Sequence, residues 1–240
     1  MHFAPAFLFC ISLSTIAASF LPSHEYILPH SQNMEDYGFR IPSIHESAVQ
    51  ARRILHLETI GTLSTVFPSD APISPTENRP PGLAGSPIGL MDYFGDCEPD
   101  TGNPTILAIG IATSFKNVAA GSNITLSLRW HPPNMRKYSA ANMPRFSLVG
   151  RLEEMREVEV RKNGVTNCFV DYHPDAAAWL PGNSIHESRW TRLIVEDIYW
   201  IGGFGDRAYI GWIPSEEWRN VTKEEIQSIK LPGEKSGRFW

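Results

Sequence analysis

The sequence of 240 residues has only three cysteines, no dense run of positive charge and no long apolar segment beyond its N-terminus. Its net charge is −5, and Lys and Arg are scattered, so the basic surface typical of nucleic-acid-binding proteins is not expected. No segment after residue 20 reaches the ~18 consecutive apolar residues that a membrane-spanning helix needs. The chain is therefore expected to bind no nucleic acid and to have no membrane span.

Motifs for several catalytic and metal-binding classes are also missing. The sequence contains no Gly-x-Ser-x-Gly, no Walker motif and no Cys-His nucleophile arrangement. His173 and His186 lack short ligand spacing and a second Cys/His cluster, so no metal site is expected. His173 is instead expected to end a helix, near its negative pole. Asp92, Asp96 and Glu98 form an acidic group near a turn, which we interpret as a solvated loop.

The chain has enough apolar residues to build a core. Hydrophobic residues make up 42% of it, with seven Trp, twelve Phe and seven Tyr, a composition that excludes disorder of the whole chain. We expect one domain of roughly 180 residues with flanking tails.

The N-terminal segment is typical of a secretory signal peptide. An apolar core runs from Phe3 to Ile16 and is followed by Ala17-Ala18-Ser19, small residues that suit cleavage after Ser19. We therefore expect a signal peptide over residues 1–19 and a proline-containing flexible leader over 20–42. The predicted location is extracellular or the lumen of the endomembrane system.

Two sequons and two cysteines bear on that location. Asn-Ile-Thr begins at Asn123 and Asn-Val-Thr begins at Asn220, so both asparagines are candidate N-glycosylation sites. Cys97 and Cys168 remain after removal of the signal peptide, in an oxidising compartment. Two interpretations stay open: the two cysteines form a disulfide, or Cys168 is a small core residue of a helix.

Hydrophobic periodicity predicts an α+β domain without a βαβ rhythm. Ser43 and Glu46 form a capping box that begins the first helix, which Gly61 closes. Further helices are predicted over 114–120, up to Tyr172, and on the surface over 222–229, with a long exposed loop over 68–85. About six strands are predicted, within 61–67, 86–95, 104–111, 123–130, 145–155 and 189–203, with a short final run at 207–213.

The order of several motifs resembles one family. They are ARRILHLETIGTLSTV, GLMDYFGD, ATSFKNVAAGSNITLSL, LVGRLEEM, YHPDAAAWLPGNSIH and RLIVEDIYWIGGFGDRAYI. The chain is similar to the CREG family, secreted glycoproteins within the pyridoxamine-phosphate-oxidase-like (PNPOx-like) superfamily of FMN-binding split barrels. The resemblance implies a single split β-barrel domain over 43–222, followed by a C-terminal tail over 223–240.

The resemblance also implies a homodimer, with a crevice between the protomers where superfamily enzymes hold FMN. That crevice is where a protein or small-molecule ligand is expected to bind. Some strand aromatics should then face the partner rather than the core. The candidates are Tyr93, Phe94, Trp190, Tyr199 and Trp200.

The resemblance further suggests where a flavin phosphate would bind. Flavin-binding members usually carry Ser or Thr and then Arg-Lys before a helix that leads into an Asn-Leu pair. Aligning Asn117 and Val118 on that pair puts Ser114 where the lysine usually stands. Thr113 and Ser114 keep the hydroxyls, whereas Lys116 would point about 200° further round a helix. We interpret Lys116 as a solvated surface residue.

Two other cations could supply the charge that is missing at this site. Arg52 and Arg53 could do so, or they could be ordinary exposed helix residues.

Two functional hypotheses follow. The first hypothesis is a secreted binding or regulatory glycoprotein whose flavin crevice is degenerate and holds no cofactor. The second is an FMN-dependent oxidoreductase acting on a small molecule, with Thr113, Ser114 and Lys116 on the phosphate.

Overall fold

A computed structural model describes residues 40–72 and 77–234 of the chain. The expected signal peptide, most of the expected leader and residues 235–240 lie outside these ranges. The strands are β1 (Ile60–Val66), β2 (Pro87–Tyr93), β3 (Thr105–Ile109), β4 (Ile124–Arg129), β5 (Arg145–Glu154), β6 (Ser188–Ile201) and β7 (Ile210–Ile213). The α-helices are α1 (Ile44–Leu57), α2 (Thr113–Ala119), α3 (Glu157–Lys162), α4 (Val165–Tyr172), α5 (Ser215–Arg219) and α6 (Lys223–Ser228). Short 3₁₀ turns are η1 (Met135–Lys137), η2 (Ala140–Asn142) and η3 (Pro174–Trp179).

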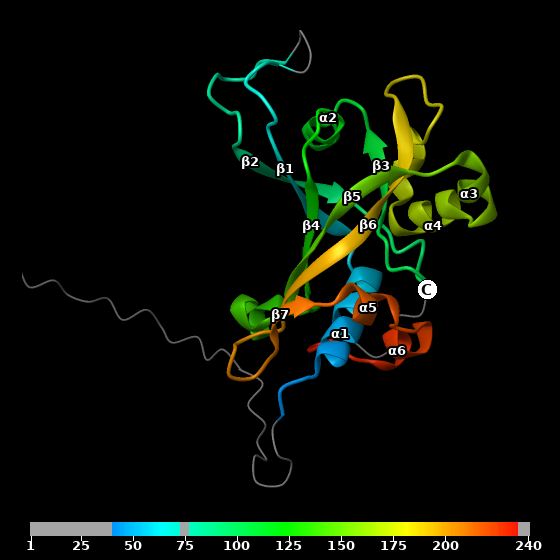
Figure 1. The fold of residues 1–240 in the computed structure, drawn as a ribbon. Coiled ribbons are helices and arrows are strands. Elements are labelled where there is room, and N and C mark those ends of the chain that lie inside the picture. Colours follow the sequence, from blue (N-terminus) through cyan, green and yellow to red (C-terminus); the bar gives the residue numbers. More distant parts are fainter. Residues whose placement is uncertain (1–39, 73–76, 235–240) are drawn as a thin grey trace, which may run out of the picture.

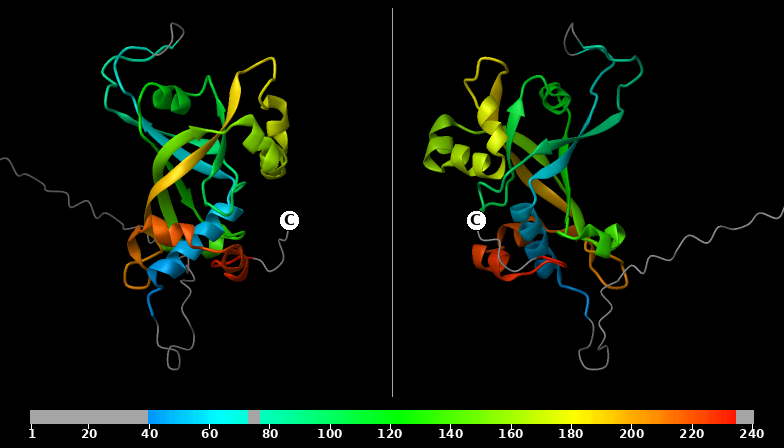
Figure 2. Two further views of the ribbon diagram at one scale, coloured as in Figure 1. Left: turned by 45° about the vertical axis from the view of Figure 1, so that its right-hand side comes forward. Right: turned by 180° about the vertical axis from the view of Figure 1, so that it is seen from behind.

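The strands form one antiparallel sheet that curls into a half-barrel (Figure 1). Its order is β2-β1-β4-β5-β6-β3, and β7 pairs with β6 near one end. Every strand pairing is antiparallel, as expected from the absence of a βαβ rhythm. Helices α1, α5 and α6 gather at one end of the barrel, and α2 lies at the other (Figure 2). The predicted α+β split-barrel fold is confirmed.

The strand periodicity separates a core face from an opposite face. On β6, the large side chains from Leu193 to Trp200 that belong to the main core cluster are all buried, and Trp190 is buried in a second cluster. On β4, Ile124, Leu126 and Leu128 alternate with half-buried or exposed residues, as the sequence pattern indicated. We call the opposite face of the sheet, from Met91 of β2 across to Trp212 of β7, the open face.

The C-terminal segment contributes to the same core. A capping box of Thr222 and Glu225 begins α6, the helix predicted at the surface over 222–229. Ile226 in α6 and Leu231 beyond it are nevertheless buried within the main cluster. Helices α3 and α5 were not predicted, because each is short and buries one large side chain, Val160 and Trp218 respectively.

The two cysteines form a disulfide, which decides between the two interpretations. Cys97 and Cys168 are joined with an S–S distance of 2.06 Å, linking the segment after β2 to α4. Around this bond lies a second cluster that includes Phe169 and Trp190, whose rings are 5.1 Å apart. Helix α4 is thereby fastened to the sheet by both a covalent bond and apolar packing.

His45 connects three helices through two carboxylates. Its Nδ1 lies 2.9 Å from Glu217 of α5, and its Nε2 lies 2.8 Å from Glu225 of α6. The hydrogen bonds to Glu225 and Glu217 raise the pKa of His45 above its ordinary value. While His45 is protonated, its two ion pairs therefore hold α1 against both α5 and α6.

We expect this contact to make the stability of the protein pH-dependent. Because the folded-state pKa of His45 is raised, its contribution is complete below the unfolded-state value of about 6.5 and is lost as pH rises through the folded-state value. His45→Gln should therefore flatten the fall in unfolding temperature that sets in as the pH rises above about 6.5. Thermal unfolding followed by circular dichroism measures this.

A matched control is His186→Gln, since the His186 side chain takes part in no ion pair of the described residues. His186→Gln should keep the wild-type pH dependence. Equal slopes for wild type and His45→Gln would show that the His45 contacts contribute nothing to stability.

Candidate functional site

The open face is hollow across its middle because small residues occupy its centre. One transverse row crosses six strands in register. It consists of Met91, Thr62, Ser127, Ser147, Tyr199 and Trp212. The central residues carry hydroxyls, and the Oγ atoms of Ser127 and Ser147 are 2.8 Å apart. The large side chains stand at the two edges, where Met91 is 80% exposed and Trp212 is 57% exposed.

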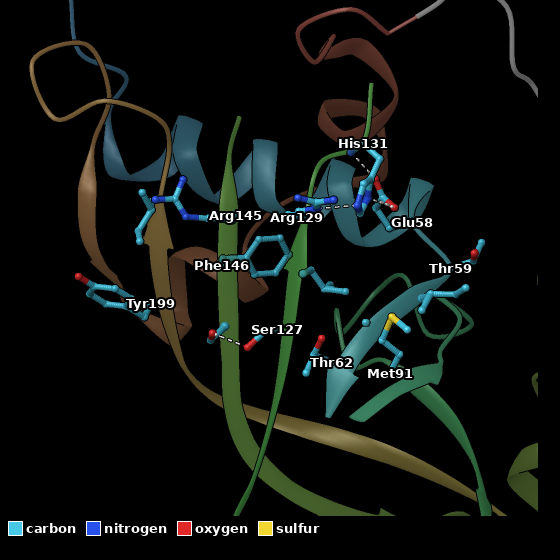
Figure 3. A pocket seen from close by; sticks show the side chains of 15 residues that line it. Glu58, Thr59, Thr62, Met91, Ser127, Arg129, His131, Arg145, Phe146 and Tyr199 are labelled. Carbon is cyan, nitrogen blue, oxygen red and sulfur yellow. Dashed lines mark hydrogen bonds and ion pairs between the residues drawn. The ribbon is translucent and has the colours of Figure 1, made fainter. Parts of the chain in front are cut away.

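A pocket of about 770 Å³ lies on this face (Figure 3). Its size falls within the range of roughly 300–1,000 Å³ that small-molecule sites occupy. The lining residues come from the end of α1 and from β1, β2, β4, β5 and β6. They are 58–62, Met91, 127–129, His131, 145–147, Tyr199 and Ile201.

One end of the pocket is built on Glu58, the residue that caps the C-terminus of α1. Its Oε1 accepts a hydrogen bond of 2.7 Å from the backbone N–H of His131, and its Oε2 lies 2.9 Å from His131 Nδ1. Arg129 Nε donates to His131 Nε2 over 2.6 Å. Since Nε2 accepts, the proton of the neutral imidazole is on Nδ1 and is donated to Glu58. The carboxylate thus orients the imidazole, and the imidazole holds Arg129.

A second arginine stands beside the first. Arg129 and Arg145 are direct partners in the β4–β5 pairing, and both line the pocket. Arg145 Nη1 donates to the carbonyl oxygen of Ala141 over 3.1 Å. In Figure 3 the Arg129 guanidinium lies beside His131 and Glu58, whereas the Arg145 side chain extends to the other side of β5.

The residues predicted to hold a flavin phosphate lie elsewhere. Thr113, Ser114 and Lys116 belong to α2, at the opposite end of the barrel, and none of them lines the pocket. Ser114 is only 2% exposed, and Thr113 and Lys116 are half-buried. Lys116 lies in the last turn of α2 rather than in its first. No contact of the described residues tests their role with phosphate, which stays a prediction.

Arg52 and Arg53 are not exposed helix residues, and that interpretation is wrong. Arg52 is fully buried, where its Nη1 donates to Trp218 O over 2.9 Å and its Nη2 donates to Pro99 O. Arg53 is buried in an ion pair with Glu234. Each buried guanidinium has hydrogen-bond or ion-pair partners, because a buried charge without partners is strongly unfavourable.

The interpretation of the acidic group as a solvated loop is also wrong for two of its members. Asp96 is buried, and its Oδ2 lies 3.1 Å from His56 Nδ1. Glu98 lies 3.1 Å from Arg192, and its burial raises its pKa. The segment folds inward because Cys97 is bonded to α4. Asp92 is half-buried, and burial raises its pKa too.

His173 ends α4, as predicted, and makes structural contacts. Its ring stacks on Tyr93 with centroids 4.0 Å apart, and its Nε2–H donates to Phe94 O over 2.9 Å. Burial lowers the pKa of His173, which favours the neutral imidazole. Within residues 40–72 and 77–234, no group of three or more His, Cys, Asp or Glu side chains could hold a metal ion. In the same ranges, no helix is long and apolar enough to cross a membrane.

The aromatic residues considered for an interface divide into two groups. Phe94, Trp190 and Trp200 are buried in the core of one chain, whereas Tyr93 and Tyr199 are partly exposed. Sequence reasoning missed the residues that build the pocket, above all Glu58, Arg129, His131 and Arg145. The two arginines stand at the end of β4 and the start of β5, and only the pairing of those strands brings them together.

Comparisons with known proteins bear on the family and the fold. The model of a family described as CREG, beta-barrel matches residues 42–220. The structure of a heme-binding protein from Mycobacterium smegmatis matches with a TM-score of 0.55 and 19% identity, over 75% of this chain and 61% of that one. A protein of unknown function from Agrobacterium tumefaciens matches with a TM-score of 0.48 and 22% identity, over 78% and 62%.

An FAD-binding protein from Mesorhizobium loti matches with a TM-score of 0.41 and 13% identity, over 63% of this chain and 91% of that one. This chain covers 61% of the mycobacterial protein and 62% of the Agrobacterium protein, which is less than two thirds of the length of each. The mycobacterial match shows a shared fold alone. The search of curated proteins found no match.

Proposed function

Since this chain belongs to the CREG β-barrel family, we propose that it is a secreted binding glycoprotein whose barrel is a scaffold and whose flavin crevice is degenerate. The observation that carries this proposal is the separation of two features. The groups expected on a flavin phosphate lie on α2, while the pocket of about 770 Å³ lies on the open face and is lined by other residues.

The residues on α2 do not fit a flavin phosphate. The hydroxyl of Ser114 is buried, and Lys116 lies away from the first turn, where free backbone N–H groups favour an anion. Arg52 and Arg53 are already bound inside the protein. Each missing charge-assisted hydrogen bond costs about 1.5–3 kcal/mol, or about one to two decades of affinity. Flavin binding at this helix is therefore expected to be weak.

Absorption of freshly purified protein and titration with FMN test this proposal. We expect no flavin bands in the visible spectrum and no submicromolar affinity for added FMN. Lys116→Ala should change the affinity no more than Lys162→Ala, a control at an exposed position on α3. Tight FMN binding that Lys116→Ala alone weakens about tenfold or more would instead establish the oxidoreductase hypothesis.

The proposal of secretion rests on the N-terminal segment and on the exposure of both sequon asparagines. Asn123 precedes β4 and Asn220 ends α5, and both side chains are exposed. In a eukaryotic host the secreted protein should lose mass on endoglycosidase treatment. The double variant Asn123→Gln/Asn220→Gln should show no such change, while each single variant reports its own site. Retention of an unprocessed form in the cytosol would contradict secretion.

We further propose that the protein is a homodimer that pairs through the open face. Exposed apolar side chains stand at the edges of the central row, and such patches are typical of interfaces. A partner covering Met91, Tyr199 and Trp212 would leave the hollow centre of the face as a crevice between two copies. The pocket would then be shared by the two protomers.

Light scattering after glycan removal tests the dimer. We expect twice the chain mass at micromolar concentration, and Met91→Glu should shift the protein toward monomer, because it buries a charge in the interface. Val158→Glu is the matched control, since Val158 is exposed on α3, away from the open face. A monomeric wild type, or equal effects of the two variants, would contradict pairing through this face.

A further inference from the structure

Two like charges stand opposite each other at one end of the pocket. Arg129 and Arg145 are direct partners across β4 and β5, so their Cβ atoms are about 4.5–5.5 Å apart. Like charges directly opposite each other destabilise a sheet. An anion that accepts charge-assisted hydrogen bonds from these guanidinium groups would offset the repulsion.

Neither arginine has an acidic partner among the residues that the structure describes. Arg129 uses Nε on His131, and Arg145 uses Nη1 on Ala141 O. Their remaining N–H groups have no acceptor within residues 40–72 and 77–234. The nearest acid of the pocket, Glu58, has both oxygens engaged with His131. This end of the pocket therefore carries a net positive charge with free donors.

Glu58 and His131 together fix the position of the Arg129 side chain. Glu58 fixes the backbone and ring of His131, and the ring accepts the hydrogen bond from Arg129 Nε. The terminal nitrogens of Arg129 stay free for a ligand. A planar guanidinium with its terminal donors available matches the geometry of a carboxylate or phosphate.

The rest of the pocket suits an uncharged body. Ile60, Met91 and Ile201 supply apolar surface, and the Tyr199 ring stands at one edge. The floor between them carries the paired hydroxyls of Ser127 and Ser147. The pocket is thus cationic at one end and mainly apolar beyond it.

We propose that Arg129 and Arg145 form an oxyanion-binding subsite, and that the pocket takes a small organic acid with an aromatic or alkyl body. This inference rests on the proposed binding function of the open face. The anionic group bonds to the free terminal N–H groups of Arg129 and Arg145, and the body lies over Ser127 and Ser147 toward Met91. The subsite is separate from the α2 residues considered for a flavin phosphate.

Calorimetric titration with three related probes tests the subsite. The probes are 1-naphthoate, 1-naphthyl phosphate and the neutral 1-naphthamide. We expect the wild type to bind at least one anion about tenfold or more tightly than the amide, with affinity falling as salt is added. Comparison of the two anions decides whether a carboxylate or a phosphate ester is preferred.

Variants locate the effect. Arg145→Gln and Arg129→Gln should each weaken binding of the preferred anion about tenfold and leave the amide unchanged. Arg151→Gln is the matched control, because Arg151 lies on the same strand but is paired with Glu153 and Glu196. In low salt without probe, Arg145→Gln should unfold at the same temperature as wild type or higher, since one repulsion is removed.

The outcomes separate the subsite from the wider function. Equal affinity for amide and anions, equal effects of Arg145→Gln and Arg151→Gln, or no binding of any probe would overturn the subsite. If the amide binds as tightly as the anions, the pocket would still be a ligand site, but one without an oxyanion subsite. Tight FMN binding with visible flavin bands would overturn the proposed function, and its dependence on Arg145 would then support or overturn the subsite separately.

Discussion

The guanidinium of Arg52 joins three parts of the chain that lie far apart in sequence. It donates to Trp218 O in α5 and to Pro99 O in the segment after β2, and its Cζ lies 5.2 Å from the centre of the Trp218 ring. Gly102, at φ 68°, permits this approach, because a Cβ there would lie 2.7 Å from Arg52 Cζ. These contacts fix α1, and the end of α1 carries Glu58. The cationic end of the pocket therefore depends on a buried contact that lies outside the pocket.

The two faces of the sheet are specialised by residue size. The core face of β4 and β5 carries large apolar side chains such as Leu126 and Leu148, whereas the open face opposite them carries serines in the centre. A bulge at Gly150 accompanies the curl, and a Cβ at this position would lie 1.9 Å from Ile194 O. The curled sheet, with small central residues and large edge residues, forms most of the pocket. Glu58 at the end of α1 and His131 after β4 complete one end of it.

The fold could be predicted from local patterns, but the site could not. Alternation on β4 and the capping box of Ser43 act over a few residues, so a single sequence reveals them. The opposition of Arg129 and Arg145 depends on strand register, which local periodicity does not encode. The burial of Arg52 could not be predicted from its neighbours in the sequence, because its partners, Pro99 and Trp218, are distant along the chain. The disulfide was left open for the same reason.

Thr222 combines two requirements in one hydroxyl group. It is the third residue of the sequon that begins at Asn220, and its Oγ1 also accepts the backbone N–H of Glu225 at the start of α6. Removal of such a cap costs about 0.5–2 kcal/mol. A Thr222→Ala protein would therefore lose the glycan acceptor sequence and weaken a helix that packs into the core. Serine meets both requirements, so tolerance to substitution at residue 222 should be narrower than at an ordinary sequon on a loop.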